Sequence, residues 1–209
     1  MKSITTANEM TAPRSFKALT DELRIELLRK SIHLLIGFVP ALASFSVGLT
    51  IGLLAIGVVI YALCENLRLS GIEVPLVSHI TSLAARRRDS GKFVLGPITL
   101  GVGALLALLL YPNPAASIAI YALAFGDGLS SLVGKSFGTV RMPFTGGKSL
   151  EGSLTCLTAV FVSAFALTKD APRSFAVALA ATIIEAAPLK DFDNIVLPVC
   201  TGAAAVLLF

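Results

Sequence analysis

Six long apolar segments divide this chain, and they limit what it can fold into more than any other feature. They lie at residues 31–64, 93–111, 115–134, 152–168, 174–189 and 195–209. Only 14% of the residues are charged, against roughly 25% in a soluble domain, and the mean hydropathy is +0.84. About 20 consecutive apolar residues cross a bilayer as a helix. The sequence therefore predicts an all-α, polytopic integral membrane protein.

The first apolar segment, residues 31–64, is too long for one crossing. Pro40 and the sequence FSVG at residues 45–48 favour a turn inside it, so we expect a hairpin of two short helices. With the other five segments this gives about seven transmembrane helices. Residues 1–19 are expected to form a flexible cytoplasmic segment and residues 20–209 a single transmembrane catalytic domain, whose first helix has Thr20 as its N-cap.

The basic residues orient these helices through the positive-inside rule. All but two of the 17 Lys and Arg residues fall in the amino-terminal segment or in loops on its side of the membrane, including the run Arg86–Arg88. Lys169 and Arg173 fall on the opposite side. We therefore expect a cytoplasmic amino terminus, an active site that faces the cytoplasm, and a bacterial inner membrane as the location. Membrane lipids are expected partners, and no nucleic acid is expected to bind.

A single carboxylate interrupts the apolar segment 115–134. Asp127 lies within it, between Gly126 and Gly128. A carboxylate at bilayer depth costs roughly 2.5–3.5 kcal/mol on insertion scales, and such residues are usually functional. Ser130 follows at helical spacing, and small polar residues of this kind also serve helix packing. Because packing does not need a carboxylate, a functional role is favoured for Asp127.

A loop rich in glycine and lysine follows, at residues 135–152. It contains Lys135, Arg141 and the sequence GGKS, which comprises Gly146, Gly147, Lys148 and Ser149. The loop is not a P-loop, because position 142 is Met where that motif requires glycine. Lysines and free backbone amides are nevertheless the groups that bind a phosphate. We expect this loop to bind phosphates beside Asp127.

Polar residues also mark the ends of the first two spans. Arg29, Lys30 and His33 share one helix face, and they are either phosphate ligands or interfacial anchors beside a packed histidine. His33 favours the first alternative, because it lies within the apolar register. Glu65 and Arg68, three residues apart, form either an intrahelical ion pair or part of a site.

Two further carboxylates, Glu185 and Asp193, are expected at the membrane level of Asp127. Each also has a structural alternative, since Glu185 can pair with Lys190 and Asp193 can be an N-cap. Clustered carboxylates repel one another unless a cation joins them. Carboxylate oxygens together with phosphates are typical Mg²⁺ ligands. The sequence therefore predicts Mg²⁺ as the cofactor, with Asp127, Asp193 and Glu185 as its ligands.

Together these motifs resemble those of a known family. They are RKxxH at 29–33, ENLR at 65–68, GP at 96–97, FGDGLSSLVGKSFG at 125–138, GGKSLEGS at 146–153 and DNIVLP at 193–198. In this order they are similar to the polytopic lipid kinases that use CTP, namely dolichol kinase, phytol kinase and the fungal CTP-dependent diacylglycerol kinase. A more distant similarity links the chain to CDP-diacylglycerol synthases, which have a basic residue where this chain has Asn194.

The resemblance implies a phosphotransferase with an alcohol as acceptor. It would move the γ-phosphoryl group of CTP, or another nucleoside triphosphate from the cytoplasm, to the hydroxyl of a polyprenol, a phytol-like alcohol or diacylglycerol from the bilayer. Asp127, Lys148 and Glu185 are the expected catalytic residues, with Asp127 or Glu185 as general base. The expected phosphate ligands are Lys135, Gly146, Gly147, Lys148, Ser149, Arg29, Lys30 and His33. The alternatives are a CTP:phosphatidate-type cytidylyltransferase, which makes a CDP-lipid, and a small cation-coupled transporter. The chain shows no internal repeat, which disfavours the transporter.

Overall fold

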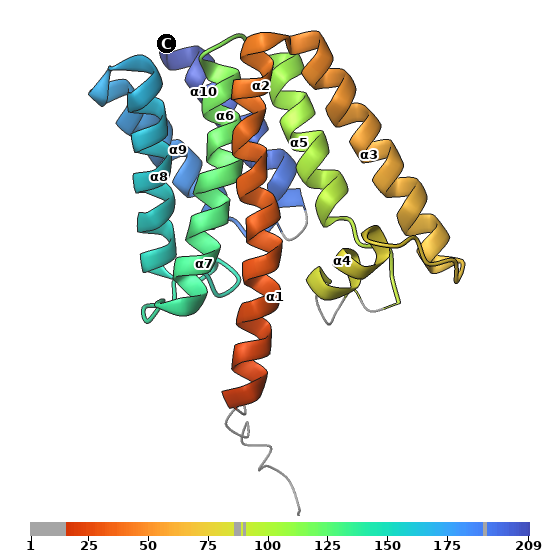
Figure 1. The fold of residues 1–209 in the computed structure, drawn as a ribbon. Helices are drawn as coiled ribbons and strands as arrows, with labels where there is room; N and C mark the ends of the chain where they lie inside the picture. The colour runs from red at the N-terminus through yellow and green to blue at the C-terminus, as the bar shows by residue number, and fades with distance from the viewer. Residues whose placement is uncertain (1–15, 86–88, 90, 190–191) are drawn as a thin grey trace, which may run out of the picture.

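The computed structural model describes residues 16–85, 89, 91–189 and 192–209, with side chains of the first helix from Leu23 onwards. Within these ranges the regular elements are all helical (Figure 1). The run Arg86–Arg88, Lys190 and the first fifteen residues lie outside the described ranges. The all-α architecture predicted from the sequence is therefore confirmed for the described part of the chain.

The apolar segment 31–64 forms the predicted hairpin. Its elements are α1 (Phe16–Leu35), η1 (Ile36–Phe38), α2 (Val39–Phe45) and α3 (Val47–Leu69). The chain reverses at Ser46, whose backbone is extended and whose hydroxyl accepts a hydrogen bond from the Leu49 N–H at 3.3 Å. Pro40 lies in the first turn of α2, where a missing N–H leaves no hydrogen bond unmade. The turn is therefore made by the FSVG sequence and a serine cap.

Helix α1 begins earlier than the sequence predicts. It starts at Phe16, so Thr20 lies inside the helix and is not its N-cap. The four residues before Thr20 are Phe, Lys, Ala and Leu, and none of them breaks a helix. The boundary at residue 19 between a flexible segment and the transmembrane domain is consequently not a boundary of the helix.

The remaining helices complete a bundle. They are α4 (Val77–Ala84), α5 (Gly96–Leu110), α6 (Ala115–Tyr121), η3 (Ala122–Asp127), α7 (Gly128–Ser136), α8 (Leu150–Thr168), α9 (Ala171–Ala186) and α10 (Asp193–Leu208). The sequence did not predict α4. It has only eight residues, fewer than the window over which helical periodicity is recognised, and its buried residues are the polar Ser78 and Thr81.

Three helical segments are long and apolar enough to cross a membrane. They are α3, the continuous rod Ala115–Ser136 formed by α6, η3 and α7, and α8. Helices α5 and α10 are also apolar but shorter, with 15 and 16 residues. The structure thus agrees with an integral membrane protein, while the number of crossings remains a prediction.

The rod of α6, η3 and α7 lies at the centre of the bundle. Helix α8 packs against α9 and α7, and α10 packs against α5, α6 and α9. The core beside the rod is built from small side chains, such as Ala122, Cys156 and Ala178. Small residues let helix backbones approach closely, as is typical of membrane bundles.

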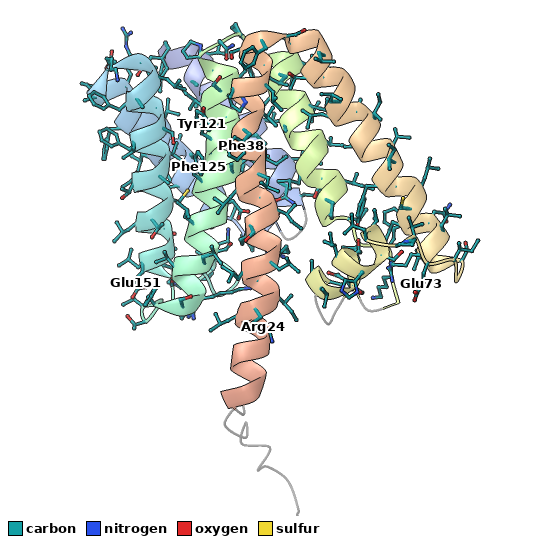
Figure 2. All side chains as sticks on the ribbon, viewed as in Figure 1. Arg24, Phe38, Glu73, Tyr121, Phe125 and Glu151 are labelled. Carbon is teal, nitrogen blue, oxygen red and sulfur yellow. The ribbon has the colours of Figure 1, made fainter. Side chains whose placement is uncertain are left out.

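The two ends of the bundle differ in character. The amino-terminal half of α1, helix α4 and the loop between α7 and α8 lie at one end, which we call the loop end (Figure 1). The carboxyl terminus lies at the other. Figure 2 shows Arg24, Glu73 and Glu151 towards the loop end, and Phe38, Tyr121 and Phe125 along the apolar middle of the helices. The polar chemistry is therefore concentrated at one end.

Candidate active site

A polar cavity of about 470 Å³ lies at the loop end, between α1, α7, the α7–α8 loop and the end of α9. Its charged and polar lining residues include Glu26, Arg29, Ser130, Lys135, Arg141, Lys148, Ser149, Glu185 and Asp193, with Gly146 and Gly147 beside them. The cavity thus gathers the glycine-rich loop and basic residues from two other helices, as the sequence predicts for a phosphate site.

The α7–α8 loop is a short hairpin that presents its glycines to this cavity. The Met142 N–H donates to the Lys148 carbonyl at 2.9 Å, and the Leu150 N–H to the Val140 carbonyl at 2.9 Å. At its tip Gly146 and Gly147 have φ of +70° and +93°, a backbone conformation that favours glycine. The loop is consequently ordered by its own hydrogen bonds.

Helix α8 begins inside the predicted phosphate loop. Ser149 is its N-cap and accepts from the Gly152 N–H at 3.2 Å. Glu151, in the first turn, accepts from the Thr139 and Val140 N–H groups at 2.9 and 3.2 Å. Glu151 was not among the predicted site residues, although an acid in the first turn after a serine is a recognisable helix-start signal.

Glu185 joins the loop to the central rod. Its Oε1 accepts from Lys148 Nζ at 2.9 Å and from Ser130 Oγ at 3.2 Å, and Lys148 Nζ also donates to the Glu185 carbonyl. Glu185 is only 5% exposed, and its Oε2 has no hydrogen-bond partner among the described residues. The cavity wall therefore holds a buried carboxylate oxygen that is free to accept.

A second carboxylate, Glu26, organises the opposite wall. It pairs with Arg29 at 3.0 Å and with Lys135 Nζ at 2.5 Å. Burial would raise the pKa of Glu26, but the Arg29 and Lys135 cations hold it below its usual value. Glu26 was not among the predicted site residues, although its i,i+3 spacing to Arg29 is visible in the sequence.

Asp127 lies behind this cavity and does not line it. It is the last residue of η3, a π-helical turn, and such turns occur frequently at functional sites. Asp127 is 3% exposed. Its Oδ2 accepts from Lys30 Nζ and lies 3.0 Å from His33 Nδ1. The preceding Gly126 lets α8 approach, since a Cβ there would lie 3.0 Å from Val160 Cγ2.

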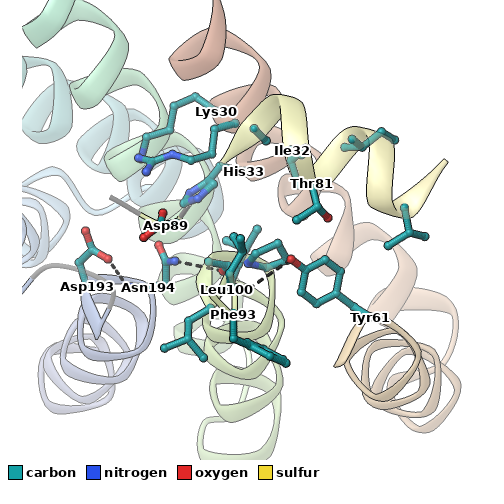
Figure 3. A pocket seen from close by; sticks show the side chains of 18 residues that line it. Lys30, Ile32, His33, Tyr61, Thr81, Asp89, Phe93, Leu100, Asp193 and Asn194 are labelled. Carbon is teal, nitrogen blue, oxygen red and sulfur yellow. Dashed lines mark hydrogen bonds between the residues drawn. The ribbon is translucent and has the colours of Figure 1, made fainter. Parts of the chain in front are cut away.

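An apolar pocket of about 280 Å³ adjoins the polar cavity, between α1, α3, α4, α5 and the start of α10 (Figure 3). Arg29 and Asp193 line both spaces. Lys30 and His33, which we predicted as phosphate ligands, line this pocket and not the polar cavity. The structure therefore divides the predicted basic cluster between two adjoining spaces.

A network around Glu65 fixes one wall of the apolar pocket. The Glu65 carboxylate accepts from Arg68 Nε and Nη2, both at 2.7 Å, and from the Val94 N–H at 2.8 Å. Arg68 Nη2 also donates to the Lys92 carbonyl at 3.1 Å, and the Tyr61 hydroxyl to the Val94 carbonyl at 3.2 Å. The intrahelical ion pair predicted at ENLR is confirmed, and it ties α3 to the segment before α5.

The predicted trio of metal ligands is not assembled. No group of three or more His, Cys, Asp and Glu side chains in the described ranges is arranged to hold a metal. Asp127 is paired with Lys30, and Glu185 with Lys148. Asp193 is not the N-cap of α10, which is Phe192; its Oδ1 accepts from the Asn194 N–H at 2.9 Å. In the described residues, lysines neutralise two of the three carboxylates, and the metal ligands therefore stay a prediction.

Two of the three carboxylates still fit a metal bound together with phosphates. Mg²⁺ usually binds one or two protein carboxylates and takes its other ligands from substrate phosphates and water. Glu185, with its unpartnered Oε2, and Asp193 both line the polar cavity. The residues present therefore fit a magnesium–nucleotide complex through Glu185 and Asp193.

Comparisons with known proteins identify the class. A probable chloroplastic phytol kinase of Triticum aestivum is 28% identical over 232 aligned residues, covering 99% of this chain and 76% of the relative. A chloroplastic farnesol kinase of Arabidopsis thaliana is 27% identical, covering 88% and 66%. An uncharacterized protein of Methanocaldococcus jannaschii is 30% identical, covering 83% and 88%. No family model matches the chain, and no solved structure matches it.

The fold and these relatives define a membrane phosphotransferase. More specifically, the chain is related over nearly its full length to the phytol and farnesol kinases. The plant relatives are named as chloroplastic enzymes, so they give no support to the predicted bacterial inner membrane.

Proposed function

We propose that this chain is a lipid kinase that transfers the γ-phosphoryl group of a nucleoside triphosphate to the hydroxyl of an isoprenoid alcohol. The resemblance of its motifs favours CTP as donor, and the names of its relatives favour a phytol-like or farnesol-like acceptor over diacylglycerol. The observation that carries the proposal is the direct contact between a polar, glycine-lined cavity and an apolar pocket at Arg29 and Asp193.

The polar cavity is suited to the triphosphate. Lys148 and Lys135 reach it from two sides, each held by a carboxylate. Phosphate oxygens would compete for these ammonium groups, so the lysines are positioned before the nucleotide arrives. Positioning and charge neutralisation are the main contributions of a protein to phosphoryl transfer.

Glu185 and Asp193 would hold a divalent cation that arrives with the nucleotide. Such a cation neutralises the charge that develops on the transferred group. Ser130 keeps Glu185 Oε1 in place through a 3.2 Å hydrogen bond, while Oε2 has no hydrogen-bond partner among the described residues. The roles of Asp127 and Glu185 thereby separate, because Asp127 does not line the cavity.

His33 is the side chain best placed to take the proton of the alcohol. It lines the apolar pocket, and its Nδ1 lies 3.0 Å from Asp127 Oδ2. A carboxylate behind an imidazole orients the ring and stabilises its protonated form. In this arrangement Asp127 is a positioning residue for both His33 and Lys30.

We further propose that the bundle crosses the membrane about seven times as a single catalytic domain, with the amino terminus and the loop end in the cytoplasm. The bias of the basic residues supports this orientation. So does the position of α4 and the α7–α8 loop at the same end of the bundle (Figure 1). Both spaces then lie near the cytoplasmic interface, where a nucleotide and a membrane alcohol can meet.

The test is a pair of reactions with purified protein in liposomes, one with γ-labelled and one with α-labelled CTP, each with farnesol and phytol. A kinase transfers label to lipid only from the γ position. Label transferred from the α position, together with pyrophosphate, would instead show a cytidylyltransferase. Absence of any alcohol-dependent product with CTP, ATP, GTP or UTP would refute lipid phosphorylation altogether.

A further inference from the structure

The apolar pocket adjoins the polar cavity, and none of its lining residues belongs to the glycine-rich loop 135–152. We infer that it binds the tail of a single-chain isoprenoid alcohol, whose hydroxyl lies at the edge formed by Arg29 and Asp193. This inference rests on the proposed function and specifies where and how the acceptor is held. Its basis is the lining of the pocket, its route to the surface and its size.

The lining is polarised along the pocket. Figure 3 shows Asp89, Asp193 and Asn194 on one side and Tyr61 and Thr81 on the other, with His33 between them; Lys30 also lines the pocket. The Tyr61 hydroxyl already donates a hydrogen bond to the Val94 carbonyl at 3.2 Å. The other lining residues include the apolar side chains of Val77, Ile80, Phe93, Leu95, Pro97 and Leu100. A ligand with one polar end and a hydrocarbon body matches this distribution.

The pocket reaches an apolar part of the surface next to α4. Ile80 and Leu95 line it, yet they are 36% and 44% exposed. Leu76, the N-cap of α4, and Leu83, within α4, are 71% and 49% exposed, and neither lines the pocket. A short helix with exposed leucines beside a membrane span is suited to lie in the interface. The tail would therefore enter laterally from the bilayer, between α4 and α5.

The volume of the pocket favours a ligand with a single hydrocarbon chain. At about 280 Å³ it lies at the lower limit of ligand pockets. Diacylglycerol has two acyl chains next to its hydroxyl, so one of them would have to remain outside. The Glu65 network holds the wall at Val94 in place, which limits expansion. A linear isoprenoid alcohol is thus the acceptor class that this pocket favours.

The experiment fills the pocket with a larger side chain placed on α4. Ile80→Trp and Val77→Trp place an indole among the lining residues, while Leu83→Trp is the matched control, because Leu83 is exposed on the same helix and does not line the pocket. Each variant is assayed in liposomes with farnesol and with the short alcohol 3-methyl-2-buten-1-ol. The pocket variants should lose about tenfold or more in kcat/KM for farnesol, while the KM for the nucleotide stays unchanged. The short alcohol should be affected much less.

Photolabelling provides a readout that does not need catalysis. A farnesol analogue with a diazirine at its tail end should label α4 or residues 93–100 in the wild-type protein and in Leu83→Trp, and excess farnesol should compete. Ile80→Trp should abolish this labelling. Labelling elsewhere, or equal behaviour of Ile80→Trp and Leu83→Trp in both assays, would overturn the inference even if farnesol is phosphorylated. If no alcohol is phosphorylated by the wild type, the proposed function fails, and the labelling still decides the pocket.

Discussion

Replacing Asp127 by Asn should destabilise the protein by about 3–5 kcal/mol, because it leaves the Lys30 ammonium buried without its carboxylate. Lys30 is 1% and Asp127 3% exposed, and the two side chains form an ion pair. For a chain of this size the loss corresponds to roughly 6–20 °C in Tm. Thermal unfolding of purified protein in detergent measures it. The exposed Glu73→Gln is the control and should change stability by less than about 0.5 kcal/mol.

A double-mutant cycle separates the ion pair from other effects of the substitution. Lys30→Met keeps a long side chain and removes the charge, so Lys30→Met with Asp127→Asn should be more stable than Asp127→Asn alone. The coupling energy should be about 1–3 kcal/mol. Activity should remain lost in the double variant, since His33 then lacks the carboxylate 3.0 Å from its Nδ1. Additive stability effects, or a double variant with normal turnover, would refute the role given to Asp127.

Three further predictions concern other parts of the molecule. Gly147→Ala should reduce kcat/KM for the nucleotide and cost about 1–2 kcal/mol of loop stability, because φ is +93° there; an unchanged KM for CTP would exclude the loop from the site. Glu65→Gln should raise the KM for the alcohol more than that for CTP, since it loosens Arg68 and the pocket wall; equal changes in both would contradict this. In a cysteine-free background, Ser136→Cys and Thr168→Cys should be labelled by an impermeant maleimide from opposite sides of the membrane, and labelling from one side would contradict the proposed topology.

Much of the fold follows from the sequence, because the lengths of the apolar segments and the turn residues between them are sufficient to predict the main helices. The hairpin within 31–64 was predicted from FSVG, and Ser46 indeed ends α2 and caps α3. Helix α4 was not predicted, because it has only eight residues, too few for a clear periodic pattern, and its buried residues are polar. The start of α1 was misplaced because Thr20 suits both an N-cap and a helix interior, and only the residues before it decide between them.

Many residues of the site were predicted from the sequence, but not which carboxylate pairs with which basic side chain. Loop glycines and basic residues can be located from their spacing, and the structure brings Lys148 and Lys135 to one cavity. Spacing does not show which carboxylate neutralises which cation, so Asp127 and Glu185 were both assigned to a metal, whereas the structure gives each a lysine partner. The Glu26–Lys135 pair was missed for the same reason, because the two residues are far apart in sequence. Long-range ion pairs depend on helix packing, which a single sequence does not reveal.

The most direct test of phosphoryl transfer at the polar cavity measures both products of one reaction. Nucleoside diphosphate and lipid monophosphate are quantified together for wild type, Lys148→Ala and the control Arg173→Ala, whose arginine is exposed and paired with Asp170. We predict equal amounts of the two products, a loss of about 10²-fold in both for Lys148→Ala, and wild-type rates for Arg173→Ala. Formation of pyrophosphate with a CDP-lipid, or an undiminished rate in Lys148→Ala, would contradict this assignment.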